Sequence, residues 1–155
     1  YRVAQLKAGA DVVQLFESWA LNLDEEAFRA QVIVPNRRTV AGVRAEIPEA
    51  AFIGFPRGAA GMIAEYAEKT GVNALGLDYA MPVGFADTAL PRALPVQGNL
   101  DPLRLVAGGA QLEERSRAII GGFANRPHIF NLGHGIVPQT PIENVDRLIR
   151  IVKGG

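Results

Sequence analysis

Two short segments of this chain combine residue types that can bind an anionic ligand or move a proton. Residues 97–102 read QGNLDP and residues 130–135 read FNLGHG, and each segment lies at the end of a short apolar run. In α/β proteins, the loops after the carboxyl ends of strands surround the ligand pocket. We therefore expect the amides, glycines and titratable groups of both segments to lie beside such a pocket.

His134 is the first candidate for a functional side chain, and it is one of two histidines in the chain. Gly133 and Gly135 flank it, which indicates a loop position. An imidazole there can donate to an anionic group or relay a proton near neutral pH. The alternative is a loop histidine that only bonds a carbonyl group. His128 stands next to Pro127 at a strand start, and we expect it to be structural.

Other strand ends carry further candidates. Ser18 lacks the Gly-x-Ser-x-Gly pattern and has no acid or histidine at a recognisable spacing, so we expect it to donate a hydrogen bond to a ligand rather than act as a nucleophile. Asp78 is either a general base or cation ligand, or a cap for the loop that follows it. Glycines at the strand ends predict room for a large ligand near the backbone; they are Gly54, Gly76, Gly98, Gly133 and Gly135.

Composition excludes several classes of protein. The 155 residues are 48% hydrophobic and 21% charged, as in an ordinary globular domain, and 16 basic residues balance 16 acidic ones. This balance argues against nucleic-acid or anionic-membrane partners. The absence of cysteine excludes disulfides and thiolate metal sites within the chain. No apolar run is long enough to cross a bilayer, and no secretory signal is visible, so we expect a cytoplasmic protein.

Short apolar runs alternate with helical patterns along the chain. The runs are nearly continuously apolar, which is typical of strands buried in a parallel sheet; they are residues 12–16, 51–55, 74–77, 94–97 and 128–131. The longest helical pattern covers residues 24–46, and Pro35 is expected to break or kink it. The other helices are expected at residues 59–70, 82–90, 111–120 and 140–152.

The last helix has the clearest pattern. Residues 140–143 (TPIE) fit a capping box. Apolar residues then recur on one helical face, which we expect to be buried; they are Ile142, Val145, Leu148, Ile149 and Val152. An N-cap is also expected at Asp101, because Pro102 follows it at the first helical position.

Five successive β-α units predict a parallel sheet. A (β/α)8 TIM barrel needs eight units and typically about 250 residues. The first residues, 1–7, read as the last turns of a helix, which suggests that a larger domain precedes them. We therefore expect residues 1–155 to be a single domain that forms the carboxy-terminal part of a TIM barrel. A five-stranded doubly wound domain is the alternative.

The motifs resemble those of the uroporphyrinogen decarboxylase family. Residues 13–19 (VQLFESW) resemble its Q-x-F-[DE]-S segment, and residues 76–78 (GLD) resemble its G-x-D strand end. Residues 97–102 and 130–135 resemble its two most distinctive carboxy-terminal motifs. The resemblance runs nearly the whole length of the chain in register.

The resemblance implies a homodimeric TIM-barrel enzyme of haem and chlorophyll biosynthesis. It implies removal of carbon dioxide from the four acetate side chains of uroporphyrinogen III, giving coproporphyrinogen III, without a cofactor or metal. It also implies that Ser18 and His134 contact substrate carboxylates and that Phe16 packs against the macrocycle. Further strand-end residues are expected to line the pocket; they are Asp78, Gln97, Asn99, Asn131 and Gly133.

The family's arginine-rich motif and catalytic aspartate belong to the amino-terminal portion of its barrel, and no match to them occurs in this chain. We therefore expect that these residues alone do not catalyse decarboxylation and need the amino-terminal portion as a partner.

Two other interpretations remain open. Related barrels transfer methyl groups from methylcobamides to thiols with a zinc ion held by histidine and cysteine, although this chain has no cysteine. Alternatively, the chain is a non-catalytic half-barrel that binds a partner. Its unpaired sheet edges, near Val13 and Ile129, would then favour association.

Overall fold

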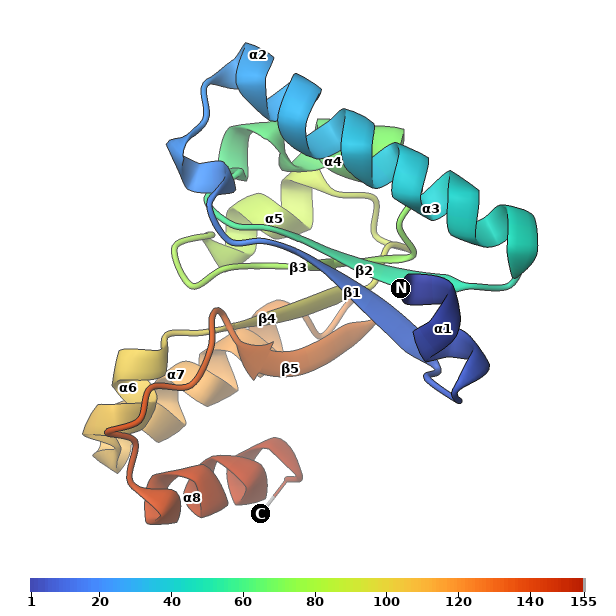
Figure 1. Cartoon of the computed structure of the whole chain (residues 1–155). Helices are drawn as coiled ribbons and strands as arrows, with labels where there is room; N and C mark the ends of the chain where they lie inside the picture. Colours follow the sequence, from blue (N-terminus) through green and yellow to red (C-terminus); the bar gives the residue numbers. More distant parts are fainter. Residues whose placement is uncertain (155) are drawn as a thin grey trace. The chain divides into compact units, whose positions relative to one another are not determined.

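The computed structural model describes residues 1–154 as two compact units, the first comprising Tyr1–Gly76 and the second beginning at Leu77 (Figure 1). Each unit contains parallel strands with helices between them. The expectation of a single domain stays a prediction.

The first unit begins with helix α1 (Arg2–Lys7) and contains three strands that pair in chain order. Strand β1 is Val12–Glu17, β2 is Ala51–Pro56 and β3 is Ala74–Gly76. Both pairings are parallel, with Val13 opposite Phe52 and Ile53 opposite Ala74. Between the strands lie α2 (Glu25–Phe28), a π-helical turn (Arg29–Ile33), α3 (Val34–Glu46) and α4 (Ile63–Thr70), and short 3-10 turns occupy Ala20–Asn22 and Ala60–Met62.

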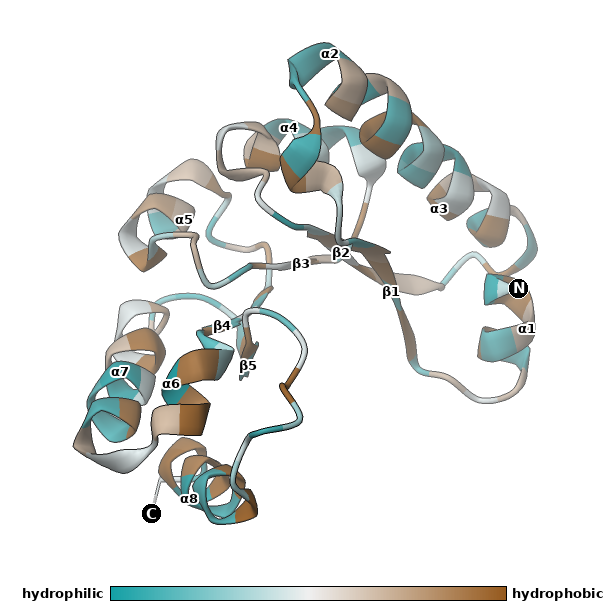
Figure 2. Ribbon diagram, turned by 60° about the vertical axis from the view of Figure 1, so that its left-hand side comes forward, coloured by the Kyte–Doolittle hydropathy of each residue, from teal (hydrophilic) through white to brown (hydrophobic). Residues whose placement is uncertain are grey.

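Helices α2, α3 and α4 lie on one side of β1 and β2 in both views (Figures 1 and 2). The core between them is apolar and includes Val13, Leu15, Phe28, Phe52, Ile63 and Tyr66. Side chains alternate across a strand, so one face of β1 is buried against these helices while the other is open. On the open face, Val12 is 45% exposed and Phe16 is 63% exposed.

The predicted helix at residues 24–46 is present but interrupted. Asp24 caps its start, because its carboxylate accepts a hydrogen bond from Ala27 N at 2.8 Å. The π-helical turn Arg29–Ile33 then leads into α3, where Pro35 stands in the first turn. A proline has no N–H to donate and crowds the preceding turn, so a wider turn at this point accommodates it. The expected break is therefore a local change of helix type.

The second unit contains α5 (Val83–Ala89), β4 (Val96–Leu100), α6 (Pro102–Ala107), α7 (Gly109–Gly122), β5 (His128–Leu132) and α8 (Ile142–Val152). Strands β4 and β5 are parallel, with Gln97 opposite Ile129 and Asn99 opposite Asn131. Helices α6, α7 and α8 lie on one side of this strand pair (Figures 1 and 2). Strand β4 begins two residues later than predicted, because Pro95 cannot donate to the ladder.

The structure corrects two expectations about α8. Pro141 stands at its N-cap without a side-chain hydrogen bond, so the capping box predicted at residues 140–143 does not form. The Thr140 hydroxyl is instead buried and lacks a hydrogen-bond partner among the described residues. Leu148 is buried as predicted, and Ile151 is buried as well. Other members of the expected inward face are exposed: Ile142 by 77%, Ile149 by 46% and Val152 by 38%.

Most strand-end glycines pack against protein atoms, which corrects the expectation of open space beside them. A Cβ at Gly54 would lie 2.5 Å from the Tyr66 ring, and one at Gly76 would lie 2.8 Å from the Phe55 ring. Gly98 abuts the carbonyl oxygen of Leu77 and Gly133 abuts the backbone of Tyr79, whereas Gly135 has open space around it. The four glycines other than Gly135 therefore permit close packing rather than ligand access.

The predicted alternation of strands and helices is confirmed, with five β-α units in the part of the chain that the structure describes. Within that part, no helix has the length and apolar character needed to cross a membrane.

Candidate functional site

The candidate residues of the first unit lie at the end of β1. Phe16 faces away from the helices, and its ring stands edge-on to the ring of Phe55 with 5.8 Å between the centroids. Ser18 follows the strand in a turn and is half-exposed. This end of the unit can therefore present an aromatic surface and a hydroxyl donor to a ligand.

In the second unit, register places amide side chains on one face of the strand pair. Gln97 and Asn99 of β4 stand opposite Ile129 and Asn131 of β5, and residues two apart share a face. The other face carries His128, whose ring lies 4.8 Å from the ring of Phe123, the residue at the end of α7. Gln97 and Asn131 therefore lie on the face opposite the helices.

Asn99 is 1% exposed, and its amide holds the loop that follows β3. Its Nδ2 donates to the carbonyl oxygen of Asp78 at 3.0 Å and to that of Met81 at 2.7 Å. Its Oδ1 is buried and has no hydrogen-bond partner among the described residues. Asn99 thus fixes one turn of backbone and leaves an acceptor unused.

Asp78 and Gly133 belong to the same local assembly. The Asp78 carboxylate is buried and accepts from Ala80 N at 2.8 Å, so the loop-capping role considered from the sequence is present. A Cβ at Gly133 would lie 2.7 Å from Cα of Tyr79, so only glycine fits against this turn. Gly133 N also donates to the carbonyl oxygen of Leu100 at 2.7 Å. The structure therefore brings Asp78, Asn99 and Gly133 together.

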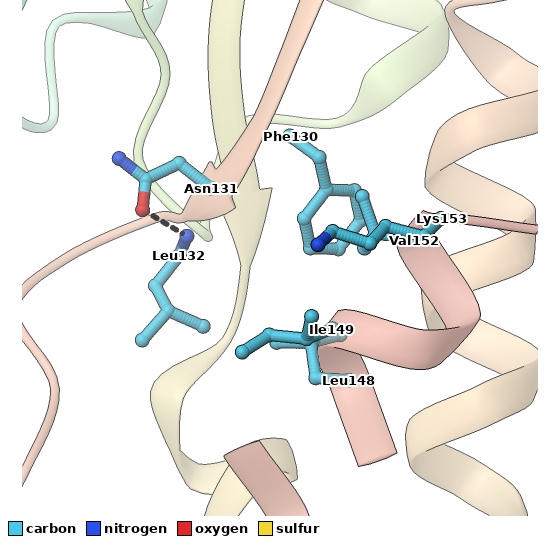
Figure 3. Close-up of a pocket in the computed structure, with 7 residues that line it drawn as sticks. All are labelled: Phe130, Asn131, Leu132, Leu148, Ile149, Val152 and Lys153. Carbon is cyan, nitrogen blue, oxygen red and sulfur yellow. Dashed lines mark hydrogen bonds between the residues drawn. The ribbon is translucent and has the colours of Figure 1, made fainter. Parts of the chain in front are cut away.

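His134 is the residue directly after Gly133, and it is exposed. Asn131 is exposed too, and its Oδ1 accepts from the backbone N–H of Leu132 at 2.8 Å (Figure 3). A fixed turn next to an exposed imidazole is an arrangement that can present a donor to an anionic group.

His128 has the structural role that its position suggests. Its Nε2 lies 2.6 Å from the carbonyl oxygen of Gly98. Burial lowers the pKa of this imidazole, and the hydrogen bond with the Gly98 carbonyl partly opposes the shift. His128 therefore links β5 to β4 on the face that the helices cover.

Glu17 of β1 is a polar residue that the sequence patterns did not indicate as a functional candidate. Glu17 lies on the same face of β1 as Val13 and Leu15, because residues two apart share a face. Its side chain therefore points toward the helices, where it is half-buried. Burial raises the pKa of its carboxyl above the usual range, and a hydrogen bond with Asn36 opposes the rise. Asn36 Nδ2 also donates to the Tyr66 hydroxyl at 3.1 Å, and burial raises the pKa of that phenol. The only signal in the sequence was an acid within an otherwise apolar strand face.

Clusters of histidine, cysteine or acidic side chains suited to a metal ion are absent from residues 1–154.

The fold and the polar strand ends define part of a (β/α)8 barrel. A methyltransferase from Methanosarcina mazei has a similar structure, with a TM-score of 0.80 over 97% of this chain and 44% of that chain. The two sequences are 20% identical, so this likeness shows the fold alone.

Sequence comparison identifies the family. The family model described as uroporphyrinogen decarboxylase matches residues 1–155. Proteins named uroporphyrinogen decarboxylase from Sphingopyxis alaskensis and Brucella anthropi are 53% and 54% identical to this chain over 155 residues. One from Erythrobacter litoralis is 49% identical over 153 residues. The chain belongs to the uroporphyrinogen decarboxylase family, and it spans 45% of the length of these relatives.

Proposed function

We propose that this chain is the carboxy-terminal portion of a uroporphyrinogen decarboxylase. The complete enzyme would remove carbon dioxide from the four acetate side chains of uroporphyrinogen III and yield coproporphyrinogen III. The observation that supports this proposal is the family match along all 155 residues, together with relatives of that name at 53–54% identity.

We assign the direct substrate contacts to Phe16, Ser18 and His134. The exposure of Phe16, at 63%, on the face opposite the helices supports packing against the apolar surface of the macrocycle. Ser18 and His134 carry donors suited to the substrate's carboxylates, and both are at least partly accessible. Charge-assisted hydrogen bonds of this kind are stronger than neutral ones and can fix a flexible, multiply charged substrate.

The remaining strand-end residues are proposed to shape the pocket. Gln97 and Asn131 share the face opposite the helices, and Asp78, Asn99 and Gly133 hold the turn beside them. An amide-rich wall offers both donors and acceptors without introducing a charge that would repel carboxylates.

Decarboxylation of an acetate attached to a pyrrole needs an electron sink, which protonation of the ring supplies. The reaction then requires a group that delivers this proton and a carboxylate that stabilises the cation. We assign both tasks to the amino-terminal portion of the longer protein. Residues 1–155 would form one barrel domain with that portion, in a cytoplasmic homodimer.

The proposal is tested with a joined polypeptide, in which the part of the Sphingopyxis alaskensis relative outside the matched region is fused ahead of residues 1–155. A bacterial strain that lacks its own uroporphyrinogen decarboxylase grows only when haem is supplied. The joined polypeptide should restore its growth without added haem. The same polypeptide with His134→Ala should restore it poorly. A soluble joined polypeptide that gives no growth would refute the proposed function.

A further inference from the structure

The two proposed substrate contacts at the end of β1 flank a residue that points the other way. Glu17 stands between Phe16 and Ser18, and its side chain faces the helices while Phe16 lies on the open face. The ladder with β2 ends at Glu17, whose carbonyl oxygen accepts from Arg57 N at 3.3 Å. Ser18 therefore lies beyond the last paired residue of the strand.

The side chain of Glu17 is held from the helix layer by Asn36 of α3. The Glu17 carboxyl group has a hydrogen bond with the Asn36 side chain. An ionised carboxylate can only accept, so the amide is the donor. Asn36 is 5% exposed, and its Nδ2 also donates to the Tyr66 hydroxyl at 3.1 Å. One amide therefore joins β1 to both α3 and α4.

Tyr66 is fixed in place by packing. Its side chain has 0% of its surface exposed, and a Cβ at Gly54 would lie 2.5 Å from its ring. Gly54 stands opposite Leu15 in the ladder, two residues before Glu17. The Tyr66 hydroxyl therefore gives Asn36 a partner at a fixed position close to the end of β1.

We propose that Glu17 and Asn36 are positioning residues for substrate binding, and that their hydrogen bond holds the end of β1. Phe16 and Ser18 then meet the substrate in one fixed arrangement, and neither Glu17 nor Asn36 touches it. Fixing an aromatic surface and a hydroxyl donor in advance strengthens binding, because ordering flexible groups costs binding free energy. The inference rests on the proposed contacts of Phe16 and Ser18, and it adds the residues that set their geometry.

A measurement on the chain alone uses Trp19, the only tryptophan in the sequence, which is 78% exposed and lies two residues after Glu17. Glu17→Leu removes the acceptor for Asn36 and should lower the fluorescence anisotropy of Trp19, because the strand end then moves more freely. Glu17→Gln keeps an acceptor oxygen and should retain the anisotropy. Circular dichroism establishes that each variant is folded.

Thr70→Val is the matched control in the same unit. It removes a buried hydroxyl that donates to the carbonyl oxygen of Tyr66 at 2.6 Å, and it leaves the bond between Glu17 and Asn36 in place. Loss of a buried hydrogen bond should lower the stability of this variant. The anisotropy of Trp19 should stay unchanged.

Kinetics of the joined polypeptide give the second measurement. Glu17→Leu should raise KM for uroporphyrinogen at least about fivefold and change kcat less than about twofold, because loss of contacts made equally before and in the transition state weakens binding alone. Glu17→Gln and Thr70→Val should leave KM unchanged. Ser18→Ala should raise KM less in the Glu17→Leu background than by itself, since the two changes act through one contact.

The inference is overturned if folded Glu17→Leu keeps either the Trp19 anisotropy or the KM of the unchanged protein, or if Thr70→Val alters both to the same extent. If Glu17→Leu does not fold, Tyr66→Phe replaces it, because this change keeps the buried ring and removes only the hydroxyl partner of Asn36. It should lower the anisotropy and raise KM by a smaller factor, and no change in either would overturn the inference. An inactive joined polypeptide would refute the proposed function instead, and the Trp19 anisotropy of the chain alone would still show whether Glu17 holds the strand end.

Discussion

Residues at the strand ends differ in how far they are buried. The Asn99 amide and the Asp78 carboxylate bond neighbouring backbone and are buried. Phe16 and His134 are exposed. The first pair therefore holds neighbouring backbone in place, while the second pair lies at the protein surface.

Removal of a proposed substrate contact should weaken catalysis in the joined polypeptide. A hydrogen bond to a carboxylate contributes about 1.5–3 kcal/mol, so His134→Ala should lower kcat/KM for uroporphyrinogen roughly ten- to hundredfold, and Ser18→Ala should act in the same direction. Steady-state kinetics measure the effect. Gln139→Ala, at an exposed position after the same strand, is the control. Equal kinetics for His134→Ala and the control would exclude His134 from substrate binding.

Glu17 should make stability depend on pH. Its pKa is raised from the usual 4.5 in the folded chain, so the folded state holds the proton more tightly than the unfolded state. Its contribution to the free energy of unfolding is full below 4.5 and is lost as pH rises through the folded pKa. Glu17→Gln, which remains neutral, should therefore become more stable relative to the unchanged chain as pH rises from 4.5 through the raised pKa of Glu17.

Urea unfolding at several pH values measures this difference. Glu26→Gln, at an exposed position in α2, controls for the change of a surface carboxylate to an amide. A stability difference for Glu17→Gln that stays constant with pH would contradict the assigned role of burial.

Elements of the second unit are joined through side-chain contacts with backbone. Asn99 of β4 holds the turn at residues 78–81, and Gly133, after β5, packs against the same turn. Arg126 acts similarly at the end of α5, where its guanidinium donates to the carbonyl oxygens of Ala86, Leu90 and Pro91. Such contacts fix loop positions that the strand ladder alone does not determine.

Loss of the Asn99 amide should destabilise the second unit. Asn99→Ala removes the donor to two carbonyl groups and should lower the free energy of unfolding by about 1–3 kcal/mol. Asn131→Ala is the comparison, since its exposed side chain bonds only the adjacent backbone N–H, and it should cost less than about 1 kcal/mol. Urea unfolding measures both; similar losses would show that the Asn99 contacts do not stabilise the turn.

Sequence patterns predicted the elements better than their ends. Apolar runs located each strand because buried parallel strands are continuously apolar, and Asp101 caps α6 as expected, with its side chain 2.9 Å from Leu103 N. The π-helical turn before Pro35 and the missing cap at Thr140 depend on how the chain packs, which local pattern does not specify.

Site residues were harder to interpret from sequence. Motifs drew attention to Asn99 and Gly133, but their contacts with residues 78–81 join segments that are 18 or more positions apart. The cluster of Glu17, Asn36 and Tyr66 likewise comes from three separate elements. Long-range contacts of this kind emerge only from the fold.

At the scale of the whole molecule, the chain carries five β-α units of a barrel family and spans 45% of its relatives' length. The open edge of β5 and the exposed apolar residues of α8 are consistent with a chain that functions together with further polypeptide. The proposed function explains why polar groups gather at the strand ends.

The most direct test of this account is the rate of coproporphyrinogen formation from uroporphyrinogen by the chain alone and by the joined polypeptide, with products separated by chromatography after oxidation to porphyrins. The account predicts that the joined polypeptide forms coproporphyrinogen and that the chain alone does not exceed the uncatalysed rate. Turnover by residues 1–155 alone would contradict the dependence on the additional portion. An inactive but folded joined polypeptide would contradict the assignment of a decarboxylase.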